Sequence, residues 1–381
     1  MKKLLLLSGI AVLANSAAYA VDLKAGDWTV SVGGIVNAYY TQISCSGGTV
    51  GGLALADRAL GCGGRSNRTT IGNGLLPSGL ITSVKSRQGD YDVAGTIGIM
   101  TATSSDSAIG TNSNVDVRQG FFSFGNERIG TVKLGRDYGI FGSNAILGDM
   151  TLVGVGSPNR ATQANRVTLG HIGAGYTYLG TYGMIAYASP VSSGIKLDAA
   201  LVSPVTNGPL GVGYDSGSSP QVQAQLSIVE SALKGWVGAK TQKFSGTDPD
   251  HHDFTMAGFE VGGSYAAGPF GVLANFQTGK GLGILSDADQ GNTKSHNYFL
   301  QGTFKATEQV KLGLNYGLSK NRDRTADSGN LESNANLTAG VYFALTPAIT
   351  LVGEIGQTRS KGFAGESSRM HGASVGGIFF F

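Results

Sequence analysis

One short stretch of the sequence gathers the residue types that bind metal ions. Residues 248–253 read DPDHHD, which places Asp248, Asp250 and Asp253 beside His251 and His252. Imidazole and carboxylate groups together can hold a divalent cation. Adjacent side chains of an extended chain, however, point in opposite directions, and the stretch is polar enough to lie in a loop. We interpret it as a solvated loop and keep metal binding by the two histidines as the alternative.

Catalytic groups do not form a complete constellation in the sequence. No serine or cysteine in a nucleophile motif stands near His171, so a catalytic triad has no support. The glycine cluster at 278–283, TGKGLG, imitates a phosphate-binding loop, but no helix pattern follows it. The sequence therefore predicts no enzyme and no cofactor.

The start of the chain indicates an oxidising compartment. Residues 1–20 combine Lys2 and Lys3, a short apolar run and a small-residue stop at Ala20, which is the order of a secretory signal peptide. We expect residues 21–381 to form one domain after its removal. Cys45 and Cys62 are the only cysteines. In that compartment we expect them to form a disulfide rather than a metal site, because a metal site usually requires four ligands.

Composition narrows the fold class. The chain has 61 glycines, 9 prolines and 41% hydrophobic residues, and after residue 20 no stretch supplies the roughly 18 apolar residues of a spanning helix. Without Lys2 and Lys3 the basic and acidic side chains nearly balance, so no nucleic-acid partner is predicted. Two classes remain: a soluble β protein, or a transmembrane barrel with apolar residues outside and polar residues inside.

Strict alternation at both ends of the chain favours the barrel. In residues 28–41 the apolar side chains Trp28, Val36 and Tyr40 share one face of a strand. In the last ten residues, GASVGGIFFF, Val375 and Phe379 share a face in the same way. Exposed phenylalanines at a strand end would promote aggregation in water, but aromatic rings are favoured at a membrane interface. The apolar face is therefore expected to meet lipid.

The same reasoning along the chain predicts sixteen strands. Short turns alternate with long polar loops, which is the pattern of an outer-membrane barrel. Residues 142–180 lack alternation, and a loop of that length inside a compact protein is usually functional. The predicted strands begin at residue 28 and continue at 68–87, 91–103, 116–124, 129–140, 181–190, 195–205, 221–231, 236–244, 256–266, 270–277, 296–305, 310–318, 336–345, 349–358 and 370–381.

The mature chain resembles the Gram-negative general porins, especially their betaproteobacterial and neisserial branch. The resemblance runs from GDWTVSVGGIVNAYY at 26–40 to the terminal Phe381. Its most specific part is VRQGFFSFGNERIGTVKLGRDYGIF at 117–141, which is similar to the family's fourth and fifth strands and the start of its third loop. The resemblance implies an all-β, sixteen-stranded transmembrane barrel in the outer membrane, assembled as a homotrimer. It also implies that the third loop, about 142–180, folds inward and narrows each water-filled pore.

The resemblance also implies pore-lining charges. Arg68 and Arg118 match the family's wall arginines, and Asp149 matches the first acid of the inward loop. Val153 and Ala186 depart from the pattern, because other members carry an acid and an arginine there. Losing the acid favours a weak preference for anions, whereas losing the arginine opposes it.

Further basic residues belong to the expected pore or its surroundings. Arg160 and Arg166 lie in the same long loop and can add positive charge at the constriction, although solvated loop charges are an equal alternative. By alternation Lys133 and Lys85 face the lumen, unless they lie at the periplasmic rim. Arg136 has outward parity, where contact with lipid would be costly, and the family keeps its first strands at the trimer interface. We therefore interpret Arg136 as an intersubunit contact.

These features predict a general diffusion porin for small hydrophilic solutes and ions. The alternative is a substrate-specific channel, in which Tyr176, Tyr178 and Tyr182 would stack on a sugar; their other interpretation is an aromatic girdle or loop packing. Expected partners are outer-membrane lipid, lipopolysaccharide and, through Phe381, the barrel assembly machinery.

Overall fold

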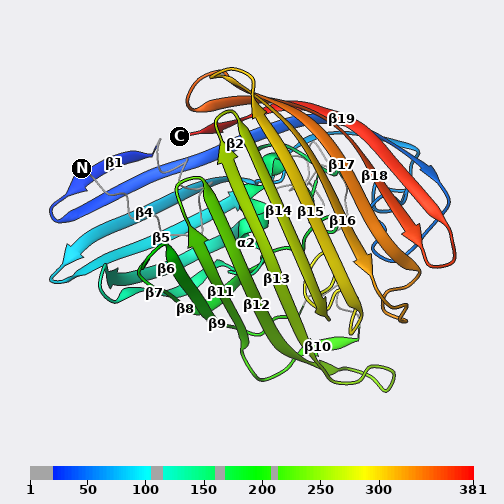
Figure 1. The fold of residues 1–381 in the computed structure, drawn as a ribbon, viewed down its shortest axis with the longest axis horizontal. Helices are drawn as coiled ribbons and strands as arrows, with labels where there is room; N and C mark the ends of the chain where they lie inside the picture. Colours follow the sequence, from blue (N-terminus) through cyan, green and yellow to red (C-terminus); the bar gives the residue numbers. More distant parts are fainter. Residues whose placement is uncertain (1–19, 104–114, 159–167, 207–212) are drawn as a thin grey trace.

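A computed structural model describes residues 20–103, 115–158, 168–206 and 213–381. Within these residues a single antiparallel sheet forms a closed, sixteen-stranded barrel (Figure 1). No helix in this part of the chain is long and apolar enough to cross a membrane. The segments are β1 (Val21–Ala25), β2 (Trp28–Gly47), β3 (Asn67–Gly72), β4 (Ser78–Gln88), β5 (Tyr91–Thr101), β6 (Asp116–Asn126), β7 (Gly130–Tyr138), β8 (Thr181–Ala188), β9 (Ile195–Val202), β10 (Tyr214–Ser216), β11 (Gln221–Val229), β12 (Leu233–Gly246), β13 (Phe254–Ala267), β14 (Phe270–Lys280), β15 (Lys294–Lys305), β16 (Val310–Asn321), β17 (Leu331–Ala344), β18 (Ile349–Gly362) and β19 (Ser367–Phe380).

The barrel closes where the two ends of the chain meet. β19 pairs with β2 from Ser368 opposite Gly47 to Phe380 opposite Ile35, and Figure 1 shows the red and blue strands side by side. Closure leaves no free edge that could recruit another chain. Phe379 remains 41% exposed on the outer face, as the sequence predicts for a lipid-facing ring.

The strands differ from the sixteen predicted ones in three places: the division between β3 and β4, and the additional short strands β1 and β10. The run predicted at 68–87 is divided into β3 and β4, which both pair with β2. Residues 73–77 break it because Pro77 has no N–H to donate and because Leu75 instead donates its N–H to Gly154 at 2.9 Å. The short β1 and β10 pair beside β2 and β12 and were not predicted.

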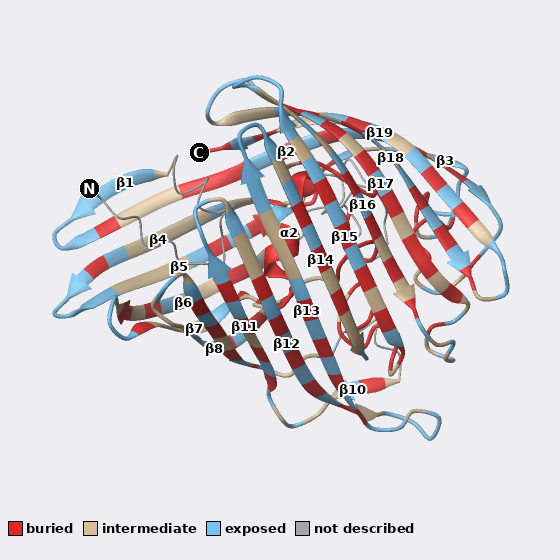
Figure 2. Ribbon diagram, in the orientation of Figure 1, coloured by how far each residue is buried: buried red, intermediate tan, exposed pale blue. Residues whose placement is uncertain are grey.

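Alternation along the strands separates a lipid-compatible outside from a polar inside. Buried and exposed positions alternate along most strands (Figure 2). In β11, Val222 and Leu226 are exposed while Gln223 and Gln225 are buried. The same division holds around the wall, as the predicted barrel requires.

Loops fill much of the interior of the barrel. The largest apolar cluster lies within the barrel and combines loop side chains with inward-facing wall residues. Between β7 and β8 the chain forms α2 (Ser143–Gly148), which contacts β13 and β14, and the 3-10 turn η1 (Met150–Val153). The cluster comprises Leu55, Leu75, Ala145, Ile146, Leu152, Leu169, Ile172, Ala174, Tyr176, Leu179, Trp236, Leu273, Leu285 and Phe299.

Candidate functional site in the barrel lumen

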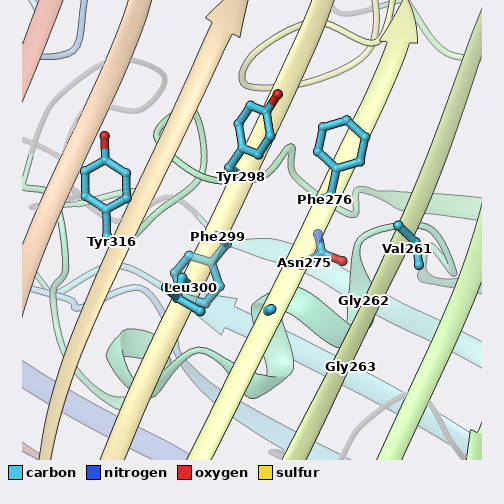
Figure 3. Close-up of a pocket in the computed structure, with 10 residues that line it drawn as sticks. Val261, Gly262, Gly263, Asn275, Phe276, Tyr298, Phe299, Leu300 and Tyr316 are labelled. Atoms are coloured by element: carbon cyan, nitrogen blue, oxygen red, sulfur yellow. The ribbon is translucent and has the colours of Figure 1, made fainter.

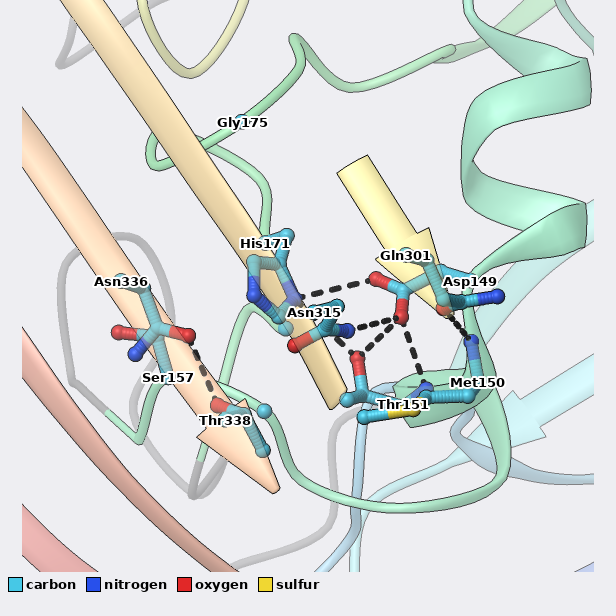
Figure 4. A network of polar contacts seen from close by, with 12 residues as sticks. Asp149, Met150, Thr151, Ser157, His171, Gly175, Gln301, Asn315, Asn336 and Thr338 are labelled. Atoms are coloured by element: carbon cyan, nitrogen blue, oxygen red, sulfur yellow. Dashed lines mark hydrogen bonds and ion pairs between the residues drawn. The ribbon is translucent and has the colours of Figure 1, made fainter. Parts of the chain in front are cut away.

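Asp149 is at the centre of a hydrogen-bond network inside the barrel (Figure 4). Its Oδ1 accepts the backbone N–H and the hydroxyl of Thr151, both at 2.8 Å. Its Oδ2 accepts the Tyr176 hydroxyl at 2.6 Å and lies 3.2 Å from Nδ1 of His171. From β16, Nδ2 of Asn315 donates to Oδ1 at 3.1 Å. The carboxylate therefore ties the loop to itself and to the wall.

Burial determines what Asp149 can do in the lumen. Only 3% of the residue is exposed. Burial alone would raise the pKa of Asp149, but His171 and the hydrogen bonds from Tyr176 and Thr151 hold that pKa below its ordinary value. The carboxylate of Asp149, which was expected to face the pore at the constriction, therefore makes the contacts that anchor the loop.

Two glutamates of the wall hold the same loop through its backbone. Glu260 of β13 accepts the N–H of Gly142 at 3.0 Å. Glu354 of β18 accepts the N–H groups of Val155 and Gly156, both at 2.8 Å. Both glutamates are buried, and buried carboxylates need such partners to offset the loss of water. They were not singled out from the sequence.

A second loop, residues 281–293, is fixed inside the barrel by an ion pair. Nζ of Lys240 on β12 bonds to Oδ1 of Asp287, and Nε2 of Gln221 donates to Oδ2 at 3.0 Å. The ammonium also lies 4.6 Å from the centre of the Phe141 ring. The side chains of Lys240 and Asp287 are 1% and 2% exposed, so breaking the pair would leave a buried, unpaired charge.

Asp289 shapes this second loop from within. Its carboxylate accepts three successive backbone N–H groups, those of residues 284–286, at 2.6 to 3.0 Å. Burial raises the pKa of Asp289 to about 7, against the opposing effect of these hydrogen bonds. Asp289 therefore titrates close to neutral pH.

Arg118 occupies a β-bulge rather than a regular position of β6. Val117 pairs with Ile99 and Gln119 pairs with Gly98, which leaves Arg118 between the two registers. Simple alternation predicts that Gly120 and Arg118 share a face of β6. Because of the bulge, they do not. Nε of Arg118 lies 2.9 Å from Oδ2 of Asp116. The guanidinium is buried near Tyr178 of the long loop.

Six lysines lie on the inward rows of β4, β7, β9, β12, β15 and β16 near the short-turn end. Lys133 bonds to Asp137, and Lys196 lies 2.6 Å from Asp198. Among the described residues, the other four form no ion pair with a carboxylate. These four are Lys85, Lys234, Lys305 and Lys311, of which all but Lys85 were missed in the sequence.

Two of the unpaired lysines contact groups other than carboxylates. Nζ of Lys234 donates to Oδ1 of Asn144 on α2 at 2.5 Å, and Nζ of Lys311 lies 5.0 Å above the Tyr342 ring. Alternation places both lysines on the inner face. No family motif lies beside them, so nothing in the sequence indicated that they have a function in the pore.

Arg68 braces the loop that the disulfide closes. Cys45 and Cys62 form the predicted bond, with Cα atoms 6.2 Å apart. Nη1 of Arg68 donates to the carbonyl of Gly61 at 3.0 Å, and its Nε donates to Thr70 at 2.9 Å. Arg68 pairs with the buried Ile43 of β2, which places it on the inward side.

The remaining predicted residues are outside the lumen or outside the described residues. Arg136 is exposed on the outer face, where its Nη2 donates to Thr181 Oγ1 at 3.2 Å. His251 lies between Asp248 and Asp327, with nitrogen-to-oxygen distances of 2.6 and 3.1 Å. No group of potential metal ligands was found in the described part of the chain. Arg160 and Arg166 fall in residues 159–167, which the structure does not describe.

Comparison with protein families identifies this architecture. The family model described as Gram-negative porin matches residues 7–362, nearly the whole chain. The chain belongs to the Gram-negative porin family. No curated protein sequence matches it.

Solved structures share the fold of this porin at low sequence identity. The outer membrane channel DcaP of Acinetobacter baumannii superposes with a TM-score of 0.70 at 14% identity, covering 94% of this chain and 99% of that one. The anion-selective porin from Comamonas acidovorans gives 0.65 at 16%, covering 93% and 100%. OmpF of Salmonella typhi gives 0.63 at 12%, covering 95% and 100%.

Family and fold together define what this porin does. It is an outer-membrane diffusion channel. Of the tyrosines considered for sugar stacking, Tyr176 is fully buried against the loop and Tyr182 is 7% exposed. Only Tyr178 is half-buried, so the three rings do not form an exposed stacking surface.

Proposed function

We propose that this porin conducts small hydrophilic solutes and ions with a weak preference for anions. The observation that carries the proposal is the different use of acids and bases on the inner wall. Asp137, Asp198, Glu260 and Glu354 are buried and hold a lysine or the long loop. The four lysines without an ion pair, Lys85, Lys234, Lys305 and Lys311, therefore dominate the accessible charge.

An excess of positive charge along a narrow passage raises the local concentration of anions. The structurally similar protein from Comamonas is described as an anion-selective porin, which supports the same sign here. We assign the constriction to Arg118 and Lys133, with Arg68 bracing the wall. Asp149 anchors the loop opposite them, and Arg160 and Arg166 are candidate contributors from the same loop.

We also infer a homotrimer. A solved relative is described as a trimer form of the Vibrio cholerae protein OmpT. Arg136 presents an exposed guanidinium on the outer face of β7, between the cross-strand glycines Gly120 and Gly183. A partner subunit would supply the polar contacts that lipid cannot. Arg136→Leu should reduce the trimer fraction in mild detergent, and an unchanged oligomer would remove Arg136 from the interface.

Planar lipid bilayers test the channel itself. Purified protein should give stepwise conductance, and its absence would refute the conduction proposal. Replacing Arg118 by Gln should move the reversal potential in a KCl gradient toward cation preference. Arg87→Gln serves as the matched control, because it removes the same charge from an arginine that is exposed at the short-turn rim and pairs with Asp92 at 3.0 Å, as Arg118 pairs with Asp116. If Arg118→Gln leaves the potential unchanged, Arg118 does not line the constriction.

A further inference from the structure

The loop closed by the disulfide enters the barrel. This disulfide loop, residues 46–61, reads SGGTVGGLALADRALG, so glycines and polar residues surround a short apolar run. Within that run Ala54, Leu55 and Ala56 are 0% exposed. Apolar side chains on an exposed loop would contact water, and burial inside the barrel removes that cost. The disulfide loop is therefore part of the packed interior.

The inner wall holds the backbone of the disulfide loop. Oδ1 of Asn334 on β17 accepts the N–H of Leu55 at 3.1 Å, and Nδ2 of Asn334 donates to the carbonyl of Leu53 at 2.9 Å. Oγ of Ser360 on β18 accepts the N–H of Ala56 at 3.0 Å. Buried backbone groups need such partners. The two wall residues thus fix the apolar run at one place in the barrel.

Two further contacts limit the shape of the disulfide loop. Oδ2 of Asp57 accepts the N–H groups of Val50 and Gly51, both at 3.0 Å, which folds the loop back on itself. The bond between Cys45 and Cys62 joins the loop to β2, and both cysteines are buried. A cross-link reduces the number of conformations that a loop can adopt. The apolar run therefore stands on a rigid support.

Leu55 packs against the long loop at a glycine. A Cβ atom added at Gly173 would lie 3.1 Å from Cδ1 of Leu55 and 2.3 Å from Cδ2 of Leu285. Gly173 has a φ of 83°, a conformation that glycine adopts without strain. Leu55, Leu285 and Ile172 belong to one apolar cluster. The disulfide loop, the second loop and the long loop thus meet at Gly173.

The same part of the long loop packs against β15. Phe299 is on β15 (Figure 3), and its ring centre lies 5.1 Å from that of His171 and 5.3 Å from that of Tyr176. Both contacts have edge geometry, which aromatic pairs favour. Residues 171–176 are therefore supported by the wall through Phe299 and by the disulfide loop through Leu55.

These contacts continue to a residue beside the assigned constriction. The N–H of Tyr178 donates to the carbonyl of Leu285 at 2.8 Å, and the Tyr178 side chain packs against the same apolar cluster. Tyr178 lies near the guanidinium of Arg118. A change at Leu55 can therefore reach Tyr178 through Leu285 and the backbone of the long loop.

We propose that Leu55 is a positioning residue for the pore. Held by the disulfide and by Asn334, it keeps the long loop in place, and the long loop keeps Tyr178 beside Arg118. If the Leu55 side chain is removed, the long loop shifts into the vacated space and the passage beside Arg118 widens. Ion selectivity and conductance depend on pore width and on the lining charges. The proposal rests on the constriction assigned under the proposed function.

Single-channel recording in planar bilayers tests the positioning role. Leu55→Ala should raise the mean conductance by roughly half and add current sublevels, because a loosened loop changes the pore width. Leu331→Ala is the matched control. Leu331 is also 0% exposed and packs against the disulfide loop, but its cluster contains no described residue of the long loop. Both variants should lose thermal stability, whereas Leu331→Ala should conduct like the unmodified protein.

Two results of this comparison would overturn the proposal. Equal conductance changes in Leu55→Ala and Leu331→Ala would show a general loosening of the interior. No change in Leu55→Ala would show that the long loop keeps its place without this contact. Leu55→Met refills the space with a side chain of similar volume and should return the conductance to the unmodified value; failure to do so would also contradict the packing argument.

A double variant tests the route through Tyr178. Tyr178→Ala should widen the passage by itself, and Leu55→Ala/Tyr178→Ala should conduct like Tyr178→Ala alone, because coupled residues are not additive. An additive increase would refute this route. Cys45→Ser/Cys62→Ser keeps Leu55 but frees its loop, so it should show the same sublevels; a steady, unmodified current would refute the role of the bond.

The unmodified protein separates this proposal from the channel function. If it gives no stepwise conductance, the proposed function itself fails. If it conducts steadily and Leu55→Ala does the same, only the positioning role of Leu55 fails.

Discussion

The middle of the lumen and its short-turn end use charge in opposite ways. At mid-strand, Asp149, Glu260, Glu354 and the Lys240–Asp287 pair are buried, and each holds an inserted loop in place. Toward the short turns, lysines line the wall, and four of them form no ion pair with a carboxylate among the described residues. A buried charge is tolerated only when it is paired. The acids of the lumen therefore stabilise the inserted loops, whereas the lysines remain available to interact with ions that pass through the pore.

The clearest way to break this division is to disrupt the buried ion pair. Asp287→Asn leaves the Lys240 ammonium buried without the carboxylate that it bonds, so the free energy of unfolding should fall by about 3–5 kcal/mol. Denaturation followed by far-UV circular dichroism in detergent measures the loss. The double variant Lys240→Met/Asp287→Leu should recover most of it. Lys320→Met breaks an exposed pair and should cost at most about 1 kcal/mol; equal losses in Asp287→Asn and Lys320→Met would contradict the anchoring role.

Opening the disulfide should have the next largest effect. Cys45 and Cys62 close a loop with a sequence separation of 17, and the greater freedom of the unfolded chain without the bond should lower the free energy of unfolding by about 3 kcal/mol. The variant Cys45→Ser/Cys62→Ser, compared with reduced unmodified protein, supplies the measurement. Full retention of stability in both would show that the loop is held by its packing alone.

The pH dependence of Asp289 sharpens the comparison. Because burial raises its pKa in the folded protein to about 7, the protonated form favours the folded loop. That stabilisation is complete below the ordinary pKa of the carboxyl and is lost as pH rises toward 7, by roughly 1 kcal/mol per pH unit between pH 5 and 7. Hydrogen exchange of residues 281–293 should therefore accelerate over this range beyond its intrinsic pH dependence. Asp289→Asn should remove the excess; if the excess persists, another group is responsible.

The smallest effect concerns a single lumen lysine. Lys234→Gln removes a charge that forms no ion pair with a described carboxylate, so the reversal potential in a KCl gradient should shift slightly toward cations. Lys196→Gln also removes one positive charge and leaves Asp198 without its lysine, so its shift should be similar in size and of the same sign. A shift toward anions in either variant would contradict the proposed distribution of accessible charge.

Sequence alternation was sufficient for the wall of the barrel. It predicted the closing strand at Phe379, the outward position of Arg136 and, with the signal-peptide argument, the bond between Cys45 and Cys62. Each depends on neighbours along one strand or on composition, which a single sequence displays. The bulge at Arg118 could not be predicted in this way, because it results from pairing with a neighbouring strand. The division of β3 from β4 depends in part on the contact of Leu75 with the long loop, although Pro77 was a local signal for it.

The contacts inside the barrel could largely not be predicted from the sequence. Lys240 and Asp287 are 47 positions apart, and Asp149 and Asn315 are 166 apart, so no local pattern links them. The acid at Asp149 was predicted by resemblance, but its burial depends on His171 and Tyr176, which the fold brings to it. The residue type alone does not distinguish a carboxylate that anchors a loop from one that lines a pore.

The reversal potential of the unmodified porin across a planar bilayer with a KCl gradient tests the division of charge most directly. If lysines govern the accessible lumen, the potential will take the sign expected for chloride passing more readily than potassium. A potential of the opposite sign would show that acids, not lysines, control the passage.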